Sequence, residues 1–352
     1  MKKLLLTLCA VAAIAFTGCG KKIDTTNWIS NFDDAKKAAN SEGKKIILYF
    51  SALDSDGVSE RLNENVFYTD EFKTKFTQDF VLVNVDFSNS RFDTMAPNPD
   101  DENTDQKKQE LDREQLNKDM QYANLYSVQS LPTYLLLTKQ GYVIADLLID
   151  ENADFDAVAA EIESRKTRTE EVDALIKTIN TGKKAEVLEA IDTLYETTDS
   201  DYKILLSDFN KKYITLDKKN ESGKAPKHLF ALSDSLAQRA LMEQDYEKTI
   251  EILEMPTKYD FLSAEDRQQV FYSVGYFMAT SGSSDYAKIK DYFQKAVDAD
   301  PESEHAEAIK QAIAYVDEMM AEGVSTVPAA GPAEENVVPG EPSADATVET
   351  TN

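Results

Sequence analysis

Residues that could carry out chemistry are few and widely separated in this 352-residue chain. Both cysteines, the second of which is Cys19, lie near the N-terminus, and the two histidines are His228 and His305. One short turn, Ser55-Asp56-Gly57-Val58-Ser59, follows an apolar run and precedes a helical pattern. Its carboxylate and hydroxyls can cap the helix or bind an anion, whereas Ser59 would need a base to act as a nucleophile. We favour capping, because the histidines lie outside the domain that contains the turn.

The charge balance excludes one class of partner. The chain has 38 basic and 64 acidic residues, a net charge of −26 at pH 7. Nucleic-acid binding requires a basic surface that replaces the counterions of the phosphates. We therefore expect no nucleic-acid partner.

The N-terminus has the pattern of an export signal. Lys2 and Lys3 precede the apolar stretch Leu4 to Phe16, which is shorter than the ~20 residues of a membrane-spanning helix. The following Thr17-Gly18-Cys19 resembles the lipobox of bacterial lipoproteins, with Phe16 where leucine is usual. We predict a signal peptide over 1–18 and a tether over 19–27, lipidated at Cys19.

Lipidation of Cys19, for example with palmitate, would anchor the protein to a membrane of the bacterial cell envelope. The sequence does not distinguish the inner from the outer membrane. The alternative is ordinary cleavage after Ala13-Ile14-Ala15, which would leave Cys19 as a free thiol. In either case the rest of the chain contains no cysteine. An exported protein would then have no disulfide.

Residues 28–165 predict alternating helices and strands. The first helix is expected to place Trp28, Phe32, Ala35 and Ala39 on one face, with Gly43 as its stop. Apolar runs at 45–51 and 80–87 predict buried strands, Thr69 is expected to cap a helix between them, and 131–150 predicts a hairpin. The order α-β-α-β-α-β-β-α favours an α/β domain with a mixed sheet flanked by helices.

These landmarks, in this order, resemble a thioredoxin-like domain of exported bacterial proteins. The most specific match is the run Tyr126 to Thr133, in which Leu131 replaces the usual aromatic residue. The resemblance implies a cis peptide bond before Pro132, beside the turn. In active relatives the backbone at this proline binds an extended substrate strand, so a peptide could add to the same edge here.

The same resemblance places the two redox cysteines of the family at Asp56 and Ser59. Thiol–disulfide exchange needs a thiolate and a resolving thiol, and neither a carboxylate nor a serine hydroxyl can replace them. We therefore expect a protein that is not an enzyme. The least favoured hypothesis is that the protein is an active enzyme related to thiol–disulfide oxidoreductases.

Residues 169–321 predict only helices. The stretch 230–253 resembles one degenerate tetratricopeptide unit, and the stretches 268–282 and 285–303 resemble the two helices of another, with Gly275 allowing them to approach closely. Ordinary antiparallel helices would give the same pattern. The tail over 322–352 is rich in proline and acidic residues and is expected to be disordered.

No metal site or cofactor is expected. His228 and His305 are flanked by charged residues and are predicted to lie on the surface. The acidic stretch around Asp100, Asp101, Glu102 and Asp105 lacks the ligand spacing of a calcium loop and favours a solvated loop.

Two functional hypotheses follow. The first is a membrane-anchored, redox-inactive lipoprotein that serves as a protein-binding or scaffold module for unidentified envelope partners. The alternative is a peptide-binding, ligand-binding or chaperone-like module that uses the groove at Asp56, Ser59 and Pro132.

Overall fold

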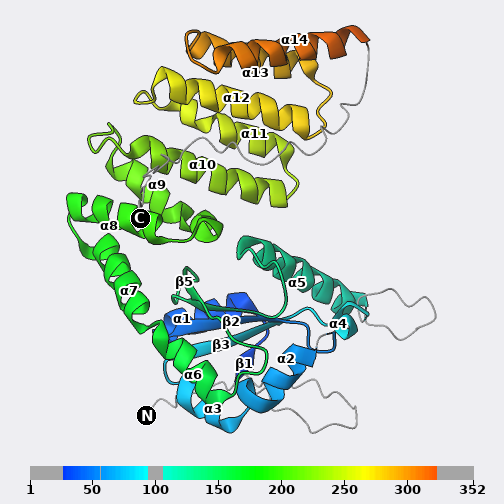
Figure 1. The fold of residues 1–352 in the computed structure, drawn as a ribbon, viewed down its shortest axis with the longest axis vertical. Helices are drawn as coiled ribbons and strands as arrows, with labels where there is room; N and C mark the ends of the chain where they lie inside the picture. The colour runs from blue at the N-terminus through cyan, green and yellow to red at the C-terminus, as the bar shows by residue number, and fades with distance from the viewer. Residues whose placement is uncertain (1–26, 56, 94–105, 323–352) are drawn as a thin grey trace, which may run out of the picture. The chain divides into compact units, whose positions relative to one another are not determined.

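The computed structural model describes residues 27–55, 57–93 and 106–322 (Figure 1). The chain divides into two compact units, Met1–Ile252 and Leu253–Asn352, and each is considered by itself. Cys19, Asp56, the acidic stretch 100–105, the predicted signal peptide and all but the first residue of the predicted tail lie outside the described residues.

The first unit contains a mixed five-stranded sheet, as predicted. Its strands are β1 (Trp28–Ile29), β2 (Lys45–Ser51), β3 (Phe80–Asp86), β4 (Thr133–Leu137) and β5 (Val143–Asp146). The strand order is β1-β3-β2-β4-β5, with β3 parallel to β1 and β2, and β4 antiparallel to β2 and β5. The central strands β2 and β3 are the two continuous apolar runs, since strands covered on both faces are apolar on both sides.

Helices cover both faces of the sheet. They are α1 (Phe32–Glu42), α2 (Gly57–Leu62), α3 (Asp70–Phe76), α4 (Asn89–Asp93), α5 (Gln106–Leu125) and α6 (Phe155–Ser164), and the π-helix η1 (Asn63–Phe67) continues α2. Gly43 ends α1 with a left-handed φ of 72°, and the Thr69 hydroxyl accepts the Phe72 N–H at the start of α3. Both helix signals predicted from the sequence are thus confirmed.

The predicted position of Trp28 is wrong. It lies in β1, and α1 begins only at Phe32, because the Asn31 side chain accepts the Asp34 N–H and caps the helix there. The apolar spacing from Trp28 to Phe32 suits a helix, but the capping residue between them determines where the helix starts.

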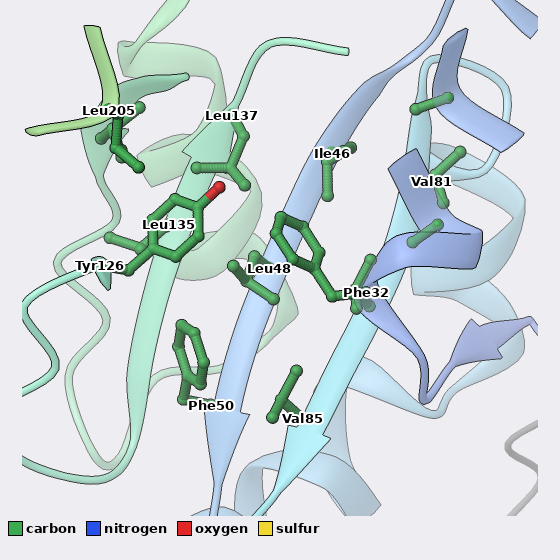
Figure 2. Close-up of a cluster of buried hydrophobic side chains, with 14 of the residues drawn as sticks. Phe32, Ile46, Leu48, Phe50, Val81, Val85, Tyr126, Leu135, Leu137 and Leu205 are labelled. Carbon is green, nitrogen blue, oxygen red and sulfur yellow. The ribbon is translucent and has the colours of Figure 1, made fainter. Parts of the chain in front are cut away.

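Successive strand residues point to opposite faces of the sheet, so two cores form. On one face Phe32 of α1 packs with Ile46, Leu48 and Phe50 of β2 (Figure 2). The Tyr122 and Tyr126 rings lie 4.9 and 5.5 Å from that of Phe32 and cover the same face. The opposite face holds an aromatic cluster made up of Trp28, Tyr49, Phe67, Phe72 and Tyr134.

After α6 the described chain is all helical, as predicted. Within the first unit the elements are α7 (Lys166–Thr181), α8 (Lys184–Thr197), the 3-10 helix η2 (Ser200–Leu206), α9 (Ser207–Leu216) and α10 (Ala225–Met242), followed by α11 (Tyr246–Glu254), whose last two residues begin the second unit. The predicted boundary between domains, near residues 165–169, stays a prediction.

The short helix η2 contributes to the core of the sheet. Its Tyr202 and Leu205 are buried in the cluster that contains Leu135 and Leu137, and Figure 2 shows Leu205 reaching that cluster from outside the sheet. The Tyr202 hydroxyl donates to Oδ1 of Asp146 in β5 at 2.5 Å. A segment well beyond the expected end of the α/β domain thus completes its packing.

The second unit contains the 3-10 helix η3 (Met255–Lys258), α12 (Ala264–Thr280), α13 (Tyr286–Ala299) and α14 (Ala306–Glu322). A Cβ atom at Gly275 would lie 2.8 Å from the Phe293 ring, too close for any side chain. Helices α12 and α13 therefore approach each other closely at Gly275, as predicted.

Shortening Leu205 to alanine is expected to make the sheet easier to unfold, because a buried Leu→Ala change costs about 2–5 kcal/mol. The single tryptophan, Trp28, lies in β1, so its fluorescence during urea unfolding reports on the sheet. Leu148→Ala, at a side chain that is 76% exposed, is the matched control and should leave the midpoint unchanged. Equal midpoints for Leu205→Ala and wild type would mean that η2 is not part of this core.

Candidate functional site

The turn singled out from the sequence lies at the carboxyl end of β2. Ser59 is in the first turns of α2 and fully buried, and its Oγ accepts the Ala52 N–H at 3.4 Å. Ser59 therefore fixes the end of the strand to the following helix and does not face solvent. Asp56, its predicted partner in the site, lies outside the described residues.

Pro132 lies at the same end of the sheet. The Leu131–Pro132 peptide bond is cis, as the resemblance implies. Thr133, the next residue, begins β4 and pairs with Phe50 near the end of β2. The structure therefore brings Pro132 and Ser59 to neighbouring strand ends, although they are far apart in the sequence.

Two carboxylates that the sequence analysis did not consider hold the turn in place. The Asp54 carboxylate accepts the Asn89 and Ser90 N–H groups, both at 2.7 Å. Asp86, the last residue of β3, accepts the Leu53 N–H at 3.1 Å and the Ser88 hydroxyl at 2.6 Å. We call this pair of residues the carboxylate clamp. It connects the loop after β2 to the loop after β3.

Hydrogen bonds keep the Asp54 carboxylate of the clamp ionised. Burial alone would raise the pKa of Asp54, but hydrogen bonds from Ser90, Ser55 and Asn89 outweigh it and leave that pKa below the usual range. A carboxylate that is fully ionised and occupied by backbone N–H groups is a weak base. The signal in the sequence was an aspartate at a strand end followed by serine and asparagine, which favours such side-chain to backbone bonds.

Apolar side chains lie beside the clamp. The Phe87 ring stacks on Phe50 at 6.4 Å and on Phe92 at 6.5 Å, and the Phe87 N–H donates to the Ser51 carbonyl. Phe92, in α4, is 40% exposed. An exposed aromatic ring thus stands next to the turn.

Neither a thiol nor a group of metal ligands is present among the residues that the structure describes. Both cysteines precede residue 27. Within the residues that the structure describes, no three His, Cys, Asp or Glu side chains are grouped to hold a metal ion. No helix in the described ranges is both long and apolar enough to cross a membrane.

The histidine prediction is half wrong. The His305 side chain is 58% exposed, as expected, but His228 is fully buried. The charged neighbour Lys227 suggested a surface position, yet His228 belongs to the inner face of α10 with Ala225 and Leu229. Periodicity along the helix was the better guide.

Removing the Asp54 carboxylate with Asp54→Ala is expected to lower stability by about 0.5–2 kcal/mol, the usual cost of losing an acceptor for helix-end N–H groups. Hydrogen exchange at the Asn89 and Ser90 amides should become faster. Glu60→Ala, at an exposed site in α2, is the control and should change neither quantity. Unchanged exchange at both amides in Asp54→Ala would contradict the clamp.

Two parts of the chain match known protein families. Residues 32–160 match a family described as "Thioredoxin-like domain", and residues 225–322 match one described as "Uncharacterised protein C-terminal domain". No curated protein sequence matches the chain significantly. A solved structure named "DsbH Oxidoreductase" is 18% identical, with 44% of this chain and 94% of that chain covered and a TM-score of 0.31. The chain thus contains a thioredoxin-like domain with a mixed five-stranded sheet, and its described remainder is an all-helical region.

Proposed function

We propose that the protein is a redox-inactive, membrane-anchored lipoprotein that binds other proteins in the cell envelope. The observation that carries this proposal is the chemistry of the turn: a thioredoxin-like fold has Asp56 and Ser59 where thiols would be needed, and Ser59 is buried against Ala52. A buried hydroxyl without a thiolate partner cannot form or resolve a mixed disulfide.

Two surfaces support binding as the role. One is the aromatic rim of the turn, where Phe92 is exposed beside Phe87. The other is on α12, where the Tyr272 and Tyr276 rings stack at 6.0 Å and are 37% and 53% exposed. Exposed tyrosine and phenylalanine rings are enriched in protein interfaces, because they bury much apolar area at little entropic cost. Tetratricopeptide-like packing of the helical region is part of the same proposal.

The second candidate is a peptide- or ligand-binding groove at the turn, bordered by Asp56, Ser59 and Pro132. The cis peptide bond at Pro132 and the neighbouring Phe92 favour it. Since Ser59 is buried, a bulkier residue there would disturb folding as well as binding. Phe92 is therefore the better position at which to test the groove.

Membrane attachment rests on Cys19 alone. We expect wild-type protein to sediment with membranes and to incorporate a clickable palmitate analogue. The variant Cys19→Ser should lose both properties, because several acyl chains anchor a protein stably and a tether without them does not. Fractionation and in-gel fluorescence check this. A Cys19→Ser variant that stays with the membranes would contradict lipid anchoring.

Site-specific crosslinking in cells tests the binding role. A photoreactive residue at position 92 or 276 reports on the rim of the turn and on α12, and one in place of Leu111, which is 55% exposed on α5, serves as the control. We expect a defined envelope protein to be captured from position 276, and Tyr272→Ala with Tyr276→Ala to reduce capture several-fold. Capture only from position 92 would favour the groove. Equal labelling from all three positions would overturn the scaffold proposal.

A further inference from the structure

A buried histidine lies where three helices of the first unit meet. His228 of α10 has no exposed surface, and its ring stacks on that of Tyr213 in α9, with centroids 3.8 Å apart. The Tyr195 ring of α8 meets it edge-on at 5.5 Å. We call this contact between α8, α9 and α10 the His228 junction. The proposed binding function does not use it.

Both ring nitrogens of His228 face side-chain oxygens. Nδ1 lies 2.8 Å from Oδ1 of Asn210, and Nε2 lies 3.2 Å from Oδ1 of Asp192. A neutral imidazole has a single N–H and can donate only one of these bonds. The ring must therefore either carry a charge or have the Asn210 amide turned the other way.

The Asn210 amide supports the second arrangement. Its Nδ2 is buried and has no hydrogen-bond partner among the described residues. Turning the amide by 180° lets Nδ2 donate to Nδ1 of His228, and the remaining ring proton on Nε2 then donates to Asp192. The rotated Asn210 amide gives its buried Nδ2 a hydrogen-bond partner and keeps the His228 ring neutral. Its oxygen then takes the place where Nδ2 had no partner.

The charges around the ring also favour a neutral histidine. Asp192 is already paired with Lys224 and Lys227, and Lys227 also pairs with Glu196 at 2.6 Å. Burial first, and the Lys227 charge second, lower the pKa of His228 to about 4, against a smaller opposing effect of Asp192. The titratable and charged groups that face the junction from the helices around it are Asp192, Tyr195 and Glu196 of α8, Lys203 of η2, Tyr213 of α9, and Lys224 and Lys227 at the start of α10.

We propose that the His228 junction is a pH-sensitive contact: it holds α8, α9 and α10 together with a neutral ring, and mild acid weakens it because the histidine takes up a proton only when the junction opens. The unfolded chain takes up this proton near the ordinary histidine pKa of ~6.5, and the folded chain only near 4. The contribution of His228 to the free energy of unfolding is therefore fully present above pH 6.5. It falls as the pH drops from 6.5 to 4, and it changes no further below pH 4.

NMR of the imidazole nitrogens tests the protonation state in the full chain. The protein has only two histidines, so His305→Gln leaves the His228 ring as the single source of imidazole signals. We expect His228 to carry its proton on Nε2 at pH 7 and to stay neutral at pH 5. A His228 ring that becomes charged between pH 7 and pH 5, or that has its proton on Nδ1, would overturn the proposal.

Stability measurements test the consequence. Between pH 7 and pH 5 the folded-to-unfolded ratio of the helical region is expected to fall by about 20-fold more in wild type than in His228→Gln. His305→Gln is the matched control and should keep the wild-type pH dependence. Identical pH dependence in wild type and His228→Gln would refute the junction as a pH-sensitive contact. If His228→Gln fails to fold, the NMR measurement on His305→Gln still decides the protonation state.

Discussion

Backbone N–H groups at the carboxyl end of the sheet need acceptors, and two aspartates provide them. The loop after β2 and the loop after β3 each leave such donors where neither strand nor helix offers a carbonyl. The bonds to Asp54 are exposed to solvent, whereas the Leu53 N–H bond to Asp86 is partly buried, and a buried N–H group without a partner costs about 1–3 kcal/mol. Asp54 and Asp86 each bridge one loop to the other, so neither loop can move without breaking bonds in its neighbour. The end of the loop after β2 and the start of α4, which carries the exposed Phe92, therefore hold each other in position.

Hydrogen bonds and strand pairing also position the residues around Ser59 and Pro132. Ser59 bonds to Ala52 just after β2, and Thr133, which follows Pro132, pairs with Phe50 of β2. Ser59 satisfies the Ala52 N–H, which a thiol would do poorly because sulfur is a weak acceptor. The serine oxygen at this position therefore ties the end of β2 to the start of α2.

Much of this arrangement could be predicted from the sequence, and the failures have physical causes. The apolar runs at β2 and β3, the helix stop at Gly43 and the cap at Thr69 are local signals that the structure confirms. The clamp is a contact between loops, and the burial of Leu205 depends on a segment that returns to the sheet from far along the chain. The aspartate followed by serine and asparagine indicates only the local bond from Ser88 to Asp86. The bonds between the two loops and the burial of Leu205 depend on tertiary packing, which no local pattern encodes.

Burial of His228 illustrates how neighbouring charges decide the state of a polar group. Asp192 alone beside an imidazole would favour the charged ring, as in many histidine–carboxylate pairs. Here two lysines already neutralise that carboxylate, and Glu196 balances the second of them. A proton added to the ring would then bring a positive charge with no unpaired counter-charge into a site without water contact. Burial first, and the charge of Lys227 second, therefore lower the pKa of His228 and keep its ring neutral.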